Sequence, residues 1–143
     1  MFNQPFPITA LGTTIALDLC DSAIRAGFPS PAADHQGRRV DLNEHLLRNV
    51  EATYLFRVMG DSMEGIGIFD GDTVIVDRSM EARHNDIILA VIDDEFTLKR
   101  LYKRGAVVKL IAENPLYLPL EFKDLQEVTV WGVATFNLRK LSN

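Results

Sequence analysis

The chain has 143 residues, a length that suits one domain with a substantial hydrophobic core. Hydrophobic residues make up 47% and charged residues 24%, as in an ordinary globular protein, and the net charge is −5. This acidic balance argues against sequence-specific binding to duplex DNA, and the single cysteine, Cys20, excludes an intramolecular disulfide and suits a reducing cytoplasm.

Residues 1–39 are predicted to form a flexible N-terminal arm, because prolines and glycines interrupt every regular pattern there. Residues 28–31, with the sequence Phe-Pro-Ser-Pro, should be extended, since a residue before proline avoids the helical region. A short helical turn is expected from about Asp18 to Arg25.

The apolar stretch 8–19 resembles the hydrophobic part of a signal peptide. However, no Lys or Arg precedes Arg25, whereas a signal peptide has a basic start. No run approaches the roughly 18 apolar residues of a membrane span. We therefore expect a cytoplasmic protein without a membrane segment.

The rest of the chain, 40–143, is predicted to be a compact, mostly β domain with one short helix. Asp41 and Glu44 form a capping-box pattern, which predicts a helix from about 42 to 48. Runs of β-branched and aromatic residues bounded by turn residues predict strands at 53–59, 72–77, 87–92, 96–101, 107–112 and 128–136. The short acidic segment 93–95 predicts a hairpin between two of them.

Ser62 lies in a tight turn, Gly60-Asp61-Ser62-Met63, and Lys99 follows 37 residues later in a strand-like run. A serine hydroxyl becomes a nucleophile when a base takes its proton. A lysine can be that base if burial lowers its pKa, and strand alternation places Lys99 on one face with Thr97 and Leu101. On spacing alone, a turn serine and a solvated strand lysine remain the competing interpretation.

Histidine is the more usual base. The three histidines, His35, His45 and His84, have no acidic partner at a diagnostic spacing, so we interpret them as surface residues. The acidic residues Asp70, Asp72 and 93–95 lack further ligands at metal-binding spacing and are interpreted as turn residues. We expect neither a metal nor a cofactor.

The chain resembles the LexA/UmuD family of self-cleaving SOS-response proteins, and its UmuD branch in particular. The resemblance runs in order from about residue 20 to 135. Its matching stretches are 26–34 (AGFPSPAAD), 41–43 (DLN), 52–54 (ATY), 60–63 (GDSM), 70–72 (DGD), 76–77 (VD) and 95–99 (EFTLK).

By position, the resemblance implies that Ser62 is the nucleophile and Lys99 the general base of an autoproteolytic serine peptidase. The backbone amides of Ser62 and Met63 would form the oxyanion hole. The bond between Ala26 and Gly27 falls where the family is cut. The UmuD branch often has Cys-Gly there, and alanine is small enough for the same narrow pocket.

The family has two branches, and length favours one of them. Only 26 residues precede the expected cleavage site, with Arg25 as the one basic residue, which is too little for a helix-turn-helix domain. A polymerase accessory protein of the UmuD kind is therefore expected, and a LexA-like transcriptional regulator is the alternative.

The resemblance further implies three partners. A RecA filament on single-stranded DNA would stimulate cleavage after DNA damage, and the product would form a homodimer. That homodimer would serve an error-prone translesion polymerase of the UmuC type. Residues 128–136, expected to be an edge strand, are a candidate dimer surface. Cleavage within one chain and between two chains both remain open.

Other classes share parts of the pattern. Esterases of the GDSL type need a histidine near the C-terminus, and no histidine follows His84. Signal peptidases use a Ser-Lys dyad but need a membrane anchor. A non-catalytic, β-rich interaction module, in which Ser62 and Lys99 are ordinary surface residues, is the remaining alternative.

Overall fold

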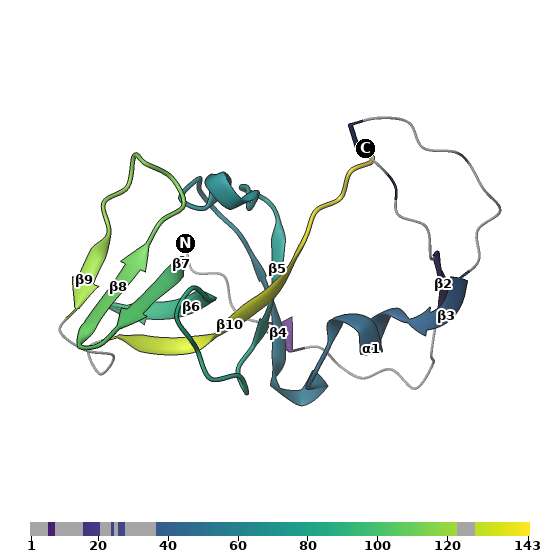
Figure 1. The fold of residues 1–143 in the computed structure, drawn as a ribbon, viewed down its shortest axis with the longest axis horizontal. Coiled ribbons are helices and arrows are strands. Elements are labelled where there is room, and N and C mark those ends of the chain that lie inside the picture. Colours follow the sequence, from purple (N-terminus) through teal and green to yellow (C-terminus); the bar gives the residue numbers. More distant parts are fainter. Residues whose placement is uncertain (1–5, 8–15, 21–23, 25, 28–36, 123–127) are drawn as a thin grey trace. The chain divides into compact units, whose positions relative to one another are not determined.

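The computed structural model describes residues 6–7, 16–20, 24, 26–27, 37–122 and 128–143. Contacts divide the chain into two compact units. One contains Met1–Thr9 and Asn49–Asn143, and the other contains Ala10–Arg48. Figure 1 shows the ribbon and labels its elements. In the described part of the chain, no helix has the length and apolar character needed to cross a membrane.

In its described residues, the smaller unit contains a two-stranded ribbon followed by a short helix. Strand β2 (Ala16–Cys20) pairs antiparallel with β3 (Gly37–Asp41), and α1 (Leu42–Leu46) follows at once. The carboxylate of Asp41 accepts the backbone N–H of Asn43 at 3.0 Å, which confirms the predicted N-cap. The helix ends at Leu46, two residues before the predicted end.

The helical turn expected from Asp18 to Arg25 is wrong for Asp18–Cys20, which belong to β2. The register places Asp18 opposite Arg39, and the two side chains form an ion pair of 2.9 Å. Pairing with β3 thus supplies hydrogen bonds that local sequence could not reveal. Residues 21–23 and 25 lie outside the described part, as do 28–31, which were expected to be extended.

The larger unit, within the described residues, holds one antiparallel sheet in the order β1-β4-β5-β10-β6-β7-β8-β9. The bounds are β1 Phe6–Pro7, β4 Thr53–Arg57, β5 Thr73–Asp77, β6 Ile87–Ile92, β7 Glu95–Arg104, β8 Val107–Ile111, β9 Leu120–Phe122 and β10 Thr129–Leu138. Two 3-10 turns, η1 (Val50–Ala52) and η2 (Glu64–Ile66), lie between strands. The mostly β fold and all six predicted strands are confirmed, whereas β1, β2, β3 and β9 were not predicted.

The hairpin between β6 and β7 is confirmed as well. Ile92 pairs with Glu95, so Asp93 and Asp94 form a two-residue loop, with φ of 49° and 63°. Two successive positive φ angles are typical of the type I′ turn, whose twist matches that of the strands it joins. This hairpin sets the register that places Lys99 opposite Ile88.

Strand β10 is an interior strand, so the prediction of an edge strand at 128–136 is wrong. Its first half pairs with β6 and its second half with β5, and Val133 pairs with residues of both. A register shift lies next to Gly132, where a Cβ atom would come within 2.6 Å of Val76 Cγ1. In Figure 1 this strand (yellow) passes both β6 and β5, its two neighbours in the sheet.

The core consists of two clusters of buried side chains. One gathers around β6, β8 and β10 and comprises Ile88, Ala90, Leu101, Val108, Leu110, Val128 and Val133. The other packs against the turn of residues 60–65, here called the serine turn, and comprises Phe56, Met63, Ile68, Val74, Val76 and Leu89. Trp131 packs edge-on against Tyr54, Phe56 and Phe96 beside this second cluster. The second cluster therefore supports the segment that carries Ser62.

Candidate active site

Ser62 lies in the turn that leads into η2, and this turn is held at both sides. Gly60 has a φ of 90°, a conformation that glycine adopts without strain, and its N–H donates to Asp70 Oδ1 at 2.8 Å. On the other side of Ser62, the side chain of Met63 is only 2% exposed and packs into the core. The hydroxyl of the half-buried Ser62 is thus carried by a well-anchored backbone.

Lys99 reaches Ser62 from strand β7. Its Nζ lies 3.1 Å from Ser62 Oγ, 2.8 Å from Thr97 Oγ1 and 3.1 Å from the backbone oxygen of Leu98. Thr97 and Lys99 are two residues apart on one strand, so their side chains project from the same face. The structure therefore brings together two residues that are 37 positions apart in the chain.

Burial lowers the pKa of the Lys99 amine below its ordinary value, because removal from water disfavours the charged form. A neutral amine has two N–H groups and one lone pair. The oxygens of Thr97 and Leu98 can accept both N–H groups, which leaves the lone pair for the hydroxyl proton of Ser62. This is the geometry that a general base requires.

The backbone amides expected to form an oxyanion hole are available. Within the described part of the chain, the N–H groups of Ser62 and Met63 donate to no protein acceptor. Two neighbouring N–H groups without acceptors, at the turn that carries a nucleophile, are suited to binding a developing oxyanion.

A pocket of about 530 Å³ opens beside the two side chains. Its walls come from β4, β5, β6, β7 and the serine turn, and they present polar and apolar surface in similar amounts. The apolar wall residues are Phe56, Val58, Met59, Met63, Val74, Leu89, Phe96 and Leu98, with Tyr117 at one side. The apolar part of the wall limits the access of water to the half-buried Lys99, and the pocket leaves room for a peptide with small side chains.

The remaining predicted residues have different surroundings. Ala26 and Gly27 belong to the smaller unit, where both are exposed and lie in a bend. His45 is exposed in α1, and His84 contacts the ring of Tyr102 on β7. His35 lies outside the described residues.

The acidic residues have structural partners. Asp70 accepts the N–H of Gly60, and the buried Asp72 binds Arg139 through both carboxylate oxygens, at 2.7 and 2.5 Å. Among the described residues, no three His, Cys, Asp or Glu side chains are grouped closely enough to hold a metal ion.

Sequence reasoning missed the contacts made by the loop after β8. Asn114 and Tyr117 of this loop bind Asp61, the residue before Ser62. The Asn114-Pro115 pair is a turn signal, but nothing in its local pattern shows what the turn contacts.

Comparison with known proteins gives a consistent family. The family described as Peptidase S24-like matches residues 18–135. Protein MucA of Salmonella typhimurium is 42% identical over 117 residues, which are 80% of this chain and 79% of MucA. Protein SamA of Salmonella typhimurium strain LT2 is 40% identical over 115 residues, 80% of this chain and 79% of SamA.

A LexA repressor, from Ectopseudomonas mendocina, is 39% identical over 118 residues. These residues are 82% of this chain but 57% of that repressor. The larger coverage of MucA and SamA agrees with the UmuD-type resemblance of the sequence. The chain therefore belongs to the Peptidase S24-like family, as a UmuD-type member of the LexA/UmuD group.

Proposed function

We propose that this protein cleaves itself between Ala26 and Gly27, with Ser62 as nucleophile and Lys99 as general base. The observation that carries this proposal is the 3.1 Å distance between Lys99 Nζ and Ser62 Oγ at the wall of the pocket of about 530 Å³. The lowered pKa of the Lys99 amine supports it, because an amine must be neutral to accept the serine proton.

The chemistry follows from the positions of these groups. Ser62 Oγ attacks the carbonyl carbon of Ala26 while its proton passes to Lys99 Nζ, and the N–H groups of Ser62 and Met63 bind the oxyanion. The C–N bond then breaks, and Lys99 returns the proton to the amine of Gly27. Water hydrolyses the ester between Ser62 and Ala26, which yields residues 1–26 and 27–143. The ester can form within one chain or between two.

The biological role that we propose is a response to DNA damage. Cleavage is stimulated by a RecA filament on single-stranded DNA, and residues 1–39 act as the arm that is cut. Residues 40–143 act as the peptidase and dimerisation domain. The cleaved homodimer then acts in the cytoplasm as an accessory subunit of a UmuC-type translesion polymerase. Membership of the family and similarity to MucA and SamA support this role.

The decisive experiment is intact-mass spectrometry of the purified protein after incubation at alkaline pH. We expect two products whose masses correspond to cleavage between Ala26 and Gly27. Ser62→Ala should leave the fold intact and abolish cleavage, because methyl cannot attack a carbonyl. Cleavage of Ser62→Ala at the wild-type rate would show that another residue is the nucleophile. A wild-type chain that stays whole at every pH, even with activated RecA, would favour the non-catalytic interaction module.

A further inference from the structure

The loop between β8 and β9 contacts the chain next to both members of the dyad. We call residues 113–117 of this loop the positioning loop. Asn114 Nδ2 donates to the backbone oxygen of Asp61 at 2.9 Å, and the hydroxyl of Tyr117 donates to the Asp61 carboxylate. Asp61 immediately precedes Ser62, so two side chains of this loop hold the residue that sets the direction of the nucleophile.

A third contact holds the far side of the same turn. The N–H of Gly65 donates to the backbone oxygen of Glu113 at 2.7 Å. The approach is so close that a Cβ atom on Gly65 would lie 2.4 Å from that oxygen. The serine turn is therefore bound to the positioning loop both before and after Ser62.

The same loop is joined to the strand of the general base. The carboxylate of Glu113 pairs with Arg100 Nε, and Arg100 directly follows Lys99 on β7. Arg100 is itself held by the backbone oxygen of Asn85, which accepts from its Nη1 at 2.7 Å. One loop thus connects the segment of the nucleophile to the strand of the base.

Hydrogen bonds within the positioning loop fix its conformation. The side-chain oxygen of Asn114 accepts the N–H of Leu116 at 3.0 Å, and its backbone oxygen accepts the N–H of Tyr117 at 3.1 Å. The amide of Asn114 therefore uses its oxygen to shape its own turn and its nitrogen to hold Asp61.

We infer that the positioning loop sets the distance and angle between Ser62 and Lys99, with Asn114 and Tyr117 as positioning residues that act through Asp61. The inference rests on the proposed self-cleavage and extends it to residues that touch neither the substrate nor the reacting atoms. A displacement of about 1 Å in such a site can cost roughly 100-fold in rate, so these contacts have kinetic consequences.

The direction in which the pKa of Tyr117 is shifted fits this role. The hydrogen bond to the Asp61 carboxylate raises the pKa of Tyr117, since ionisation would place two negative charges together. The hydroxyl therefore keeps its proton, and its bond to Asp61, further into the alkaline range in which the neutral form of Lys99 increases.

The test compares three variants with the wild type. Tyr117→Phe removes only the hydroxyl, and Asn114→Asp keeps the oxygen that accepts from Leu116 but removes the donor to Asp61. Tyr102→Phe is the matched control, because the Tyr102 hydroxyl makes no hydrogen bond within the described residues. Cleavage rates are measured without RecA from neutral to alkaline pH, and folding is followed by thermal melting.

We expect Tyr117→Phe and Asn114→Asp to slow cleavage roughly 10- to 100-fold, while Tyr102→Phe cleaves like the wild type. The pH of half-maximal rate should stay unchanged, because Thr97 and Leu98 still surround the Lys99 amine. Unchanged rates in both loop variants would overturn the inference. So would a rate loss that merely follows a loss of folded protein in the melting curves.

A second readout separates this inference from the proposed function. A fluorophosphonate probe phosphonylates a reactive serine: Ser62 Oγ bonds to phosphorus, fluoride leaves, and the serine proton passes to Lys99. Labelling of Ser62 without cleavage of the wild type would refute self-cleavage, and slower labelling of the two loop variants would still support the positioning role. Equal labelling of all variants would refute the positioning role alone. A wild type that is neither cut nor labelled would refute both.

Discussion

At the scale of single residues, the protonation state of Lys99 governs the proposed reaction. A lysine in water has a pKa of about 10.4, so it is almost entirely charged at neutral pH. Burial in the pocket lowers the pKa of Lys99. The charged form can donate to all three neighbouring oxygens, whereas the neutral form donates to those of Thr97 and Leu98 and accepts from the Ser62 hydroxyl. The residue is therefore a base whose strength depends on how much water reaches it.

We expect cleavage without RecA to be slow at neutral pH and to accelerate as the pH rises. The rate should follow the neutral fraction of Lys99, with its midpoint below the ordinary lysine value because burial lowers the pKa. RecA should permit cleavage near neutral pH. We expect it to favour a state in which the arm (residues 1–39) is docked at Ser62 and the Lys99 amine is shielded from water. Rates from about pH 6 to 10.5 test this prediction. A flat wild-type profile would contradict it.

Substitution of Lys99 separates its charge from its basicity. Lys99→Arg keeps a positive charge, but a guanidinium does not lose its proton in this pH range, so the variant should be inactive throughout. Lys99→Ala should be inactive too, because no described histidine contacts Ser62. Time courses of the intact mass measure the cleavage of each variant. Lys109→Arg on β8 is the control, because it makes the same substitution at another lysine. Normal cleavage by Lys99→Arg at high pH would rule out Lys99 as the base.

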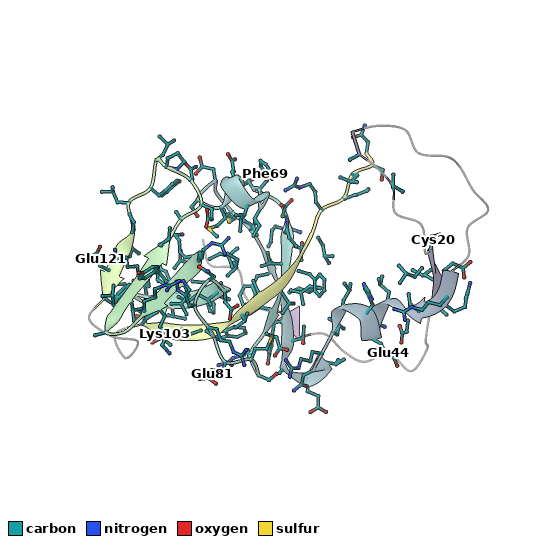
Figure 2. The ribbon with its side chains drawn as sticks, viewed as in Figure 1. Cys20, Glu44, Phe69, Glu81, Lys103 and Glu121 are labelled. Carbon is teal, nitrogen blue, oxygen red and sulfur yellow. The ribbon has the colours of Figure 1, made fainter. Side chains whose placement is uncertain are left out.

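Asp72 is the residue with the clearest role in stability. It is 3% exposed and accepts hydrogen bonds from Arg139, Asn137 and the backbone of Phe69. Arg139 also stacks over the ring of Phe69, which Figure 2 labels on the loop between η2 and β5. The pairing therefore ties this loop to the end of β10.

These partners, Arg139 above all, hold the pKa of Asp72 well below its usual range, which fixes the sign of a pH effect. A depressed carboxyl pKa contributes stability above the unfolded value of about 3.9, and this contribution is lost as the pH falls toward the folded value. Asp72→Asn should cost about 2 kcal/mol at neutral pH, less than the roughly 3–5 kcal/mol of a fully buried pair, because the Arg139 side chain is 39% exposed. Urea unfolding at neutral and acidic pH measures this, and the difference from wild type should shrink in acid. Equal stability of the two proteins at neutral pH would contradict the stabilising role of Asp72.

At the scale of elements, the serine turn depends on its contact with the positioning loop. Gly65 is required there for space, since a side chain would meet the backbone oxygen of Glu113. Backbone atoms yield less readily than the end of a flexible side chain. The turn and the loop would therefore have to separate to admit even one methyl group.

Gly65→Ala should lower the free energy of unfolding by roughly 1–3 kcal/mol, the usual range for forced overpacking, and should also slow cleavage. Glu64→Ala, a neighbouring exposed position in η2, serves as the control and should change little. Denaturant curves and cleavage rates of the folded protein report the two effects separately. A Gly65→Ala protein with wild-type stability and rate would show that the turn and the loop move apart without cost.

At the scale of the whole molecule, the proposal requires a homodimer and an activating filament. Strand β10 cannot pair edge to edge with a second copy, because it already pairs with β5 and β6 inside the sheet. We expect analytical ultracentrifugation of the purified protein at micromolar concentration to show a dimer. A monomer under these conditions would contradict the homodimer.

The activating filament is tested separately. RecA with ATP and single-stranded DNA should raise the cleavage rate at neutral pH, where we expect the isolated protein to be slow, because we propose that the filament favours the cleavage-competent conformation. Ser62→Ala with the same filament is the control and should stay whole. A wild-type rate that does not respond to the complete filament would remove RecA from the proposal.

Local sequence determined much of the secondary structure in the larger unit. Runs of β-branched and aromatic residues sufficed for six strands, since such residues favour the extended backbone wherever they lie in a fold. Asp93 and Asp94 suited the tight hairpin, and Asp41 suited the helix N-cap. The family pattern, read by position, singled out Ser62 and Lys99, which the structure places 3.1 Å apart.

Tertiary structure alone decided which segments became neighbours. Asp18–Cys20 is a strand because β3 lies beside it, and β10 is interior because β5 and β6 both pair with it. The contacts of Asn114 and Tyr117 with Asp61 join residues more than 50 positions apart. Backbone preference is a property of a few adjacent residues and can be recognised in the sequence. Pairing and packing depend on the free energy of all segments together, so they emerge only when the chain is folded.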